Sequence, residues 1–574
     1  MSGSDNIIVG GAPEGFDARL VLDEVTRRDA PVIHVARDDK RLAAMSDALR
    51  FFAPYIPVVR FPGWDCLPYD RISPNPDISA ARMATLAGLV HGMPGKFVLL
   101  TTLNAATQRV PAREVLKEAA FIAQVGQRID EAALKAFLVR MGFSQAPTVM
   151  EPGDYAVRGG IIDIYPPGET GPVRLDLFGD VLDGLRRFDP ATQRTTDKLD
   201  QIELAPVSEV ILDEAAVTRF RQNYRIEFGA AGTDDPLYEA VSAGRKHAGI
   251  EHWLPFFHEK LETVFDYLPS ATITLDDQVT AQRLSRWDSI ADQYDTRLHA
   301  LKQKSREGTV YKPVPPGLLY LDDAGWQRAL DGKRVLQFKP LPQATGPGVI
   351  DAGGRIGRNF APERQNEGLS LFGALKDHIE ARLATGPVMV ASYSDGARER
   401  LEGLLEDEGL IGAVPVANST RIGAHGLHLA VWALEAGFEA PGLTVIAEQD
   451  VLGDRLIRAP KKRRRAENFL TEAQSLSPGD LVVHVDHGVG RYQGLEVVTA
   501  AGAAHECLLL EYAEGSKLYL PVENIELLSR FGHEEGLLDK LGGGAWQAKK
   551  ARLKERIREM ADRLIRIAAE RELR

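Results

Sequence analysis

Two glycines near the start of the chain have the spacing of a phosphate-binding loop. Gly10 and Gly15 follow the apolar run at residues 7–9, and a helical pattern begins after them. A working loop of this kind continues with a lysine that binds the β- and γ-phosphates and a Ser or Thr whose hydroxyl binds Mg²⁺. Here these positions are Phe16 and Asp17, which supply no cation and would place a carboxylate beside polyphosphate. Nucleotide binding at this loop is therefore disfavoured by its charge.

A second acidic motif suggests the other half of a nucleotide site. Asp276 and Asp277 end an apolar strand, where an Asp-Glu pair normally holds Mg²⁺ and activates water. Asp213 and Glu214 form a similar pair, but the residues after them are helical in pattern and predict an ordinary helix start. We interpret residues 10–17 and the Asp276-Asp277 pair as the remains of one nucleotide site. The alternatives are a coincidental glycine spacing and a divergent ATPase.

The composition limits the class of protein. A chain of 574 residues is too long for one core and predicts about three to five domains. No apolar run approaches the roughly 20 residues of a membrane-spanning helix. Cys66 and Cys507 are the two cysteines, which favours a reducing compartment, and these two residues cannot build a zinc site alone. The net charge of −12 argues against a general DNA-coating protein. We therefore expect a cytoplasmic, multidomain protein that has no membrane segment.

The elements that must position these residues follow from the hydrophobic pattern. Apolar runs alternate with helical segments up to about residue 124, which predicts a parallel sheet covered on both faces. Short strands with turn signals then predict a small, mainly β insert before α/β texture returns at about residue 208. The Gly/Pro-rich residues 339–357 predict a linker or an extended connection to another small α/β unit. A basic run, a compact β region and one long amphipathic helix complete the chain. The fold class is multidomain α/β.

Residues 61–89 (FPGWDCLPYDRISPNPDISAARMATLAGL) resemble the first domain of the bacterial transcription-repair coupling factors. That family is itself similar to the damage-recognition protein UvrB. UvrB has intact nucleotide motifs at the positions of Gly10–Asp17 and Asp276-Asp277. UvrB also inserts an aromatic β-hairpin that grips damaged DNA, and residues 51–70 leave no room for such a hairpin here. The resemblance extends over essentially the whole chain, so the coupling-factor family fits better than UvrB.

The resemblance implies that the chain is divided into seven segments. They are a degenerate RecA/helicase-like, UvrB-like domain 1a at residues 1–124, an inserted α+β UvrA-binding module at 125–207, UvrB-like domain 1b at 208–345, a small α/β domain at 346–458, a basic linker at 459–475, a CarD-like, RNA polymerase-interacting Tudor/SH3-like β-barrel at 476–535 and a relay helix at 545–574. In the family, the relay helix leads to a motor that uses ATP and Mg²⁺ to move along double-stranded DNA. None of the motor's motifs occurs in this sequence. We expect the amino-terminal half of such a protein, with no catalytic residue, cofactor or metal of its own.

The first expected binding surface lies in the β insert. Arg158, Arg174 and Phe178 fall on the positions with which the family contacts UvrA. Arg174 and Phe178 are four residues apart along a predicted strand and therefore point to the same face. An aromatic side chain with flanking arginines is typical of an interface hot spot. The alternative is that Phe178 belongs to the core and that the arginines are merely solvated.

The second expected surface lies in the compact β region. The resemblance implies that a strand edge there pairs with the β subunit of RNA polymerase. The expected contact residues are Tyr492, Leu495, Val497 and Val498. His484 and His487 lack a third ligand and predict turn or surface residues rather than a metal site. The expected function is therefore a repair factor that docks on stalled RNA polymerase and recruits UvrA. The alternative is a stand-alone transcription regulator with no part in repair.

Overall fold

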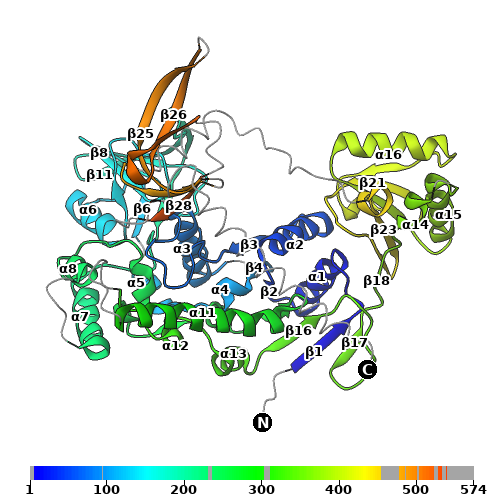
Figure 1. The fold of residues 1–574 in the computed structure, drawn as a ribbon, viewed down its shortest axis with the longest axis horizontal. Helices are drawn as coiled ribbons and strands as arrows, with labels where there is room; N and C mark the ends of the chain where they lie inside the picture. The colour runs from blue at the N-terminus through cyan, green and yellow to red at the C-terminus, as the bar shows by residue number, and fades with distance from the viewer. Residues whose placement is uncertain are drawn as a thin grey trace. The chain divides into compact units, whose positions relative to one another are not determined.

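The computed structural model divides the chain into two units, Met1–Leu456 and Ile457–Arg574 (Figure 1). In the first unit the structure describes residues 5–93, 95–119, 121–229, 235–302, 311–366 and 368–453. In the second unit it describes residues 478–484, 487–500, 503–521, 528–532 and 538. The predicted basic linker and relay helix lie outside the described residues. No helix within the described residues has the length and apolar character needed to cross a membrane.

The first unit contains a seven-stranded sheet with strand order β17-β1-β16-β15-β2-β4-β3. Its strands are β1 (Asp5–Gly10), β2 (Val32–Ala36), β3 (Val58–Phe61), β4 (Val98–Thr102), β15 (Thr272–Leu275), β16 (Arg334–Phe338) and β17 (Val349–Asp351). All neighbouring strands are parallel. Every residue of β2, β4 and β15 is buried, as is usual where helices cover both faces of a parallel sheet. The parallel sheet predicted from the first 124 residues is confirmed, and later residues complete it.

The helices and short strands around this sheet come from the chain before and after the β insert, at residues 16–118 and 214–330. The helices are α1 (Phe16–Arg28), α2 (Asp39–Phe52), α3 (Pro76–His91), α4 (Leu103–Ala106), α5 (Arg113–Glu118), α7 (Glu214–Phe228), α8 (Pro236–Ser242), η1 (Ile250–Trp253), α9 (Leu254–Phe257), α10 (Val264–Tyr267), α11 (Val279–Lys302), α12 (Pro316–Leu319) and α13 (Asp323–Leu330). Two strands, β5 (Val110–Pro111) and β14 (Leu261–Glu262), pair with each other. Asp213 caps α7 by accepting a hydrogen bond from the Ala216 amide, so the predicted helix start is confirmed.

The β insert forms a separate sheet with strand order β12-β11-β10-β9-β8-β7. Its elements are α6 (Glu131–Arg140), β7 (Ser144–Gln145), β8 (Asp154–Arg158), β9 (Ile161–Ile164), β10 (Val173–Phe178), β11 (Val181–Phe188) and β12 (Thr195–Lys198). One face of the sheet packs on α6 through a buried apolar cluster that includes Leu138, Ile162 and Leu175. The ends of the insert, β6 (Phe121–Gln124) and β13 (Gln201–Leu204), pair antiparallel.

The Gly/Pro-rich residues 339–357, expected to be a linker or an extended connection, include two β-strands. β17 pairs parallel with β1, and the Ile8 amide donates a hydrogen bond to the Gly348 carbonyl at 2.8 Å. The next strand, β18 (Arg355–Ile356), pairs with β22 of the following sheet. This stretch therefore adds an edge strand to each of two sheets, which fixes the connection between them.

The small α/β unit contains a six-stranded sheet with strand order β18-β22-β23-β19-β21-β20. Its remaining strands are β19 (Val388–Ser392), β20 (Val414–Val416), β21 (Leu427–Val431), β22 (Phe438–Ala440) and β23 (Leu443–Ala447). Its helices are α14 (Ala361–Gln365), α15 (Leu371–Leu383), α16 (Asp395–Asp407), η2 (Ser419–Arg421) and α17 (Glu448–Leu452). Leu375, Leu401 and Val451 belong to a core between these helices and the sheet.

The second unit contains a five-stranded antiparallel sheet with strand order β27-β26-β25-β24-β28. Its elements are β24 (Leu481–His484), β25 (Gly488–Ala500), β26 (Ala503–Glu511), η3 (Ala513–Gly515), β27 (Lys517–Pro521) and β28 (Leu528–Gly532). Val482, Tyr492 and Leu508 belong to its core. An antiparallel sheet is present where the CarD-like barrel is expected, and its closure into a barrel stays a prediction.

Candidate functional sites

The Gly10–Asp17 loop joins β1 to α1, and its backbone amides bond within the chain. A nucleotide-binding loop would leave these N–H groups free for phosphate. The amides and their acceptors are Gly11 to the Leu341 carbonyl (3.0 Å), Ala12 to the Lys339 carbonyl (2.9 Å), Phe16 and Asp17 to the Pro13 carbonyl (both 3.1 Å) and Gly15 to the Asp17 carboxylate (3.0 Å). Five donors that could bind an anion therefore already have acceptors.

The structure brings Asp17 and Asp276 together around a buried arginine. Arg41 of α2, which is 2 % exposed, donates from Nη2 to Asp17 and from Nε to Asp276 Oδ1, the latter at 3.2 Å. Arg37 also binds Asp276, with 3.2 Å between Nη1 and Oδ2, and its Nη2 lies 2.7 Å from Glu14. Burial raises the pKa of Asp17 to about 6 and also raises that of Asp276, while the charge of Arg41 opposes both shifts.

Arg41 thus supplies from within the chain the positive charge that the loop lacks. Lysine is absent from position 16, and without Arg41 the Asp17 carboxylate would lie in the protein interior without a cation, which is costly, while Asp276 would keep its contact with Arg37. Asp277 does not join this network; its carboxylate accepts from Lys339 Nζ at 2.9 Å. The sequence indicated Asp17 and Asp276 as parts of one nucleotide site. It gave no signal for Arg41, because the position of Arg41 in the sequence does not show that it lies beside these two residues.

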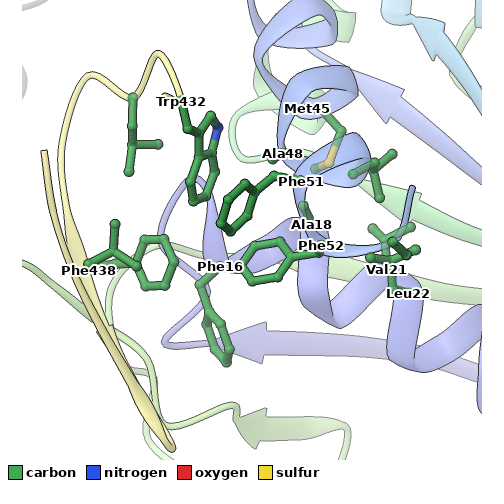
Figure 2. Packing of buried hydrophobic residues seen from close by; sticks show 14 of the residues in the cluster. Phe16, Ala18, Val21, Leu22, Met45, Ala48, Phe51, Phe52, Trp432 and Phe438 are labelled. Atoms are coloured by element: carbon green, nitrogen blue, oxygen red, sulfur yellow. The ribbon is translucent and has the colours of Figure 1, made fainter. Parts of the chain in front are cut away.

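Phe16, at the position of the absent lysine, is a core residue. It is 4 % exposed, and its ring centroid lies 6.0 Å from that of Phe438 in β22. The same cluster contains Phe51 and Trp432, whose rings stack with centroids 4.8 Å apart (Figure 2). A side chain at Gly354 would come within 2.5 Å of the Phe16 ring. The loop therefore packs against the small α/β unit.

The three predicted UvrA contacts share one face of the inserted sheet. Cross-strand partners lie on the same face, and Asp163 pairs with Arg174 while Ile161 pairs with both Arg158 and Asp176. Alternation along β10 adds Phe178 to this face and directs Leu175 into the core. We call this the outer face. Its members are Ala156, Arg158, Ile161, Asp163, Arg174, Asp176, Phe178, Gly184, Arg186 and Phe188.

Phe178 is the most exposed large apolar side chain of the outer face, at 83 %. It is therefore not the core residue of the alternative interpretation. Ile161, which the sequence reasoning missed, is 37 % exposed on the neighbouring strand. Arg158 is exposed and donates from Nη2 to the Pro147 carbonyl. Once the pairing of β9 with β10 is known, strand alternation places Ile161 on the outer face.

Arg174 is held more firmly than a solvated arginine. It forms two parallel hydrogen bonds with Asp163, Nε to Oδ1 at 2.7 Å and Nη2 to Oδ2 at 2.9 Å. Its guanidinium carbon lies 4.8 Å from the centre of the Phe188 ring. The hydrogen bond to Asp163 raises the pKa of Arg174, so the guanidinium stays charged at neutral pH. The side chain of Arg174 is 19 % exposed and that of Asp163 is 2 % exposed.

The expected polymerase contacts in β25 divide into buried and exposed residues. Tyr492 is 3 % exposed and belongs to the core, which differs from the surface position expected for it. Val497 is 69 % exposed and Leu495 is 37 % exposed, whereas Val498 is half-buried. β25 has a bulge between Tyr492 and Gly494, where the register with β26 shifts by one residue. Alternation after the bulge puts Leu495 and Val497 on one face and Val498 on the other, and the bulge places Tyr492 on the face of Leu495 and Val497.

The edge of β25 matches the expectation of a strand that could accept a partner. β24 pairs with β25 from Gly488 to Arg491, and Tyr492 continues this side by donating to the Asp480 carbonyl (2.8 Å) and accepting from the Gly479 amide (2.7 Å). Beyond that point, β26 is the partner that the described residues give to β25.

The part of the chain that the structure describes contains no group of three or more His, Cys, Asp or Glu side chains that could hold a metal ion. His484 and His487 lie with their ring centroids 4.6 Å apart.

Comparison with known proteins identifies two domains and a set of relatives. Residues 122–210 match the family model of the UvrB interaction domain, and residues 476–532 match that of the CarD-like/TRCF RID domain. Three relatives named transcription-repair-coupling factor come from Escherichia coli K12, Haemophilus influenzae and Rickettsia bellii. They are 34 %, 30 % and 29 % identical over 96 %, 99 % and 94 % of this chain, and the matches cover 48 %, 49 % and 47 % of their own lengths. The chain spans about half the length of the curated relatives it matches, and the family resemblance seen in the sequence is confirmed.

Proposed function

Because the chain is similar to transcription-repair-coupling factors along nearly its whole length, we propose that it links stalled transcription to DNA repair. It does so by docking on RNA polymerase with one surface and on UvrA with another. The observation that carries this proposal is the outer face of the inserted sheet, where Arg158, Arg174 and Phe178 lie together. That sheet lies within the match to the UvrB interaction domain.

The outer face has the chemistry of a protein-binding surface. Phe178 offers an exposed aromatic ring, Ile161 a smaller apolar patch, and the arginines charged donors around them. Interfaces of this composition concentrate binding energy in a few aromatic and arginine residues. We assign UvrA as its partner through the family resemblance.

For RNA polymerase, we propose that the second half of β25 pairs with a strand of the β subunit. Exposed Leu495 and Val497 would flank the added strand, and main-chain hydrogen bonds would supply much of the affinity. Tyr492 would support this contact indirectly, because its side chain packs with Leu510 in the core of the same sheet.

We further infer that docking, and not ATP hydrolysis, is the contribution of these residues. This inference is supported by the bonded amides of the Gly10–Asp17 loop, by the buried Phe16 and by the Arg41 network. In the family, ATP-driven movement along double-stranded DNA belongs to motor domains whose motifs do not occur in this sequence. A titration of the chain with ATP and Mg²⁺ tests the inference: saturable binding would favour the divergent ATPase.

The docking proposal is tested by measuring how purified UvrA and purified RNA polymerase bind to the immobilised chain. Phe178→Ala and Arg158→Glu alter exposed side chains, so they should weaken UvrA binding and leave polymerase binding unchanged. Val497→Asp should have the reverse effect. Polymerase binding without any UvrA binding by the unsubstituted chain would favour the stand-alone transcription regulator.

A further inference from the structure

A buried carboxylate lies on the outer face, where solvent-facing side chains are expected. Asp163 is in the middle of β9, directly across from Arg174 in β10. Its side chain is 2 % exposed, and Ala156 of β8, its other cross-strand partner, is 3 % exposed. A buried ion pair contributes little net stability compared with apolar residues of the same volume. Stability alone therefore does not account for a charged pair at this position.

The geometry of the pair gives Asp163 a second effect, because it fixes the direction of Arg174. A guanidinium has five N–H donors in a rigid plane. Asp163 accepts from Nε and Nη2 along one edge of that plane. Phe188 lies against the face of the guanidinium at 4.8 Å. With one edge and one face held, the Nη1 end of Arg174 keeps a fixed direction and its N–H donors are the ones left for a partner.

This arrangement lowers the entropy that binding must remove. A free arginine side chain has many rotamers, and part of this conformational entropy is lost when the side chain is immobilised at an interface. Arg174 is already immobilised in the free protein. Arg158 is also anchored, through the Pro147 carbonyl. Two arginines of the outer face are thus fixed before any partner arrives.

We propose that Asp163 is a positioning residue of the UvrA-docking face, which does not touch the partner but holds Arg174 in its binding orientation. The proposal rests on the proposed function. It predicts that Asp163 affects UvrA binding only through Arg174, whereas a purely structural residue would affect binding whatever residue stands at position 174.

The experiment is a double-mutant cycle on the full chain, with UvrA affinity measured by biolayer interferometry. Asp163→Asn keeps the volume but removes the charged fork, and it should weaken UvrA binding about tenfold. Arg174→Ala should weaken binding further, and adding Asp163→Asn to it should change nothing more. Arg174→Lys keeps the charge but cannot form the fork, so it should match Asp163→Asn. Glu169→Gln is the control, because it removes the partner of Arg187 in the same module, and it should leave the affinity unchanged.

RNA polymerase binding and thermal unfolding of each variant serve as checks on folding. The proposal is overturned if Asp163→Asn binds UvrA like the unsubstituted chain, or if it weakens binding equally with and without Arg174. Failure of the unsubstituted chain to bind UvrA would overturn the proposed function as well. Normal binding that is lost in Phe178→Ala and retained in Asp163→Asn would overturn the positioning role alone.

Discussion

Replacement of Arg41 by glutamine should destabilise the first unit by an amount that depends on pH. Arg41 is the partner of Asp17, whereas Asp276 keeps a contact with Arg37 at 3.2 Å. Removing one member of a buried ion pair costs about 3–5 kcal/mol because it leaves the other charge uncompensated. We expect a loss of this size at pH 8, where Asp17 must either stay ionised without its partner or take up a proton against the pH.

The loss should become smaller at pH 5. The pKa of Asp17 in the folded chain is about 6, above a value of about 3.9 for an unfolded aspartate. A carboxyl group with a raised folded pKa favours the folded state when protonated, and this stabilisation is lost as the pH rises from about 4 through 6. Without Arg41 the pKa of Asp17 should rise further, so at pH 5 the variant buries a neutral acid.

The free energy of unfolding can be compared by urea titration at both pH values, followed by far-ultraviolet circular dichroism. The control is Arg50→Gln in the same helix, because Arg50 and Asp47 form a pair with 68 % and 46 % exposed side chains. Exposed pairs contribute about 0–1 kcal/mol. A loss below about 1 kcal/mol in Arg41→Gln at pH 8, or equal losses at pH 5 and pH 8, would refute the account of Arg41 as the internal counterion.

Three further substitutions test other parts of the structure. Phe178→Ala should weaken UvrA binding at least about tenfold, since hot-spot aromatics contribute upwards of about 2 kcal/mol; a surface plasmon resonance affinity unchanged from the parent would contradict this. Phe16→Lys should leave ATP binding undetected in calorimetry and lower the unfolding temperature, because the lysine would be buried against Phe438; restored ATP binding would contradict the account. Val497→Asp should reduce polymerase capture in a pull-down while UvrA capture persists, and loss of both would indicate misfolding instead.

The sequence was informative where short-range patterns decide the structure. The apolar runs predicted β1, β2, β3 and β4 and their parallel arrangement, because buried parallel strands have continuous apolar sequences. It could not show that β15 lies between β16 and β2, since the pairing of β15 with β2 joins residues 240 positions apart, such as Thr272 and Val32. The same limit applies to Arg41, whose role depends on the distant Asp276.

Tyr492 was expected near the polymerase contact, and it lies in the core for a local reason that the sequence does not reveal. Counting alternate residues along a strand assumes that every residue has a cross-strand partner. The bulge at Gln493 breaks this count, so Tyr492 faces the core although Leu495 and Val497, on the same side, are partly exposed. In β10 no residue is skipped, and the predicted shared face of Arg174 and Phe178 agrees with the structure.

The pairing of β6 with β13 has a consequence for how such chains can change. Gln124 lies opposite Gln201 and Phe121 opposite Leu204, so the insert leaves and rejoins the remaining chain at adjacent points. A loop of any length could span these points without shifting the register of the parallel strands. A cut at this two-stranded stem would therefore remove the inserted sheet without interrupting any strand of the parallel sheet.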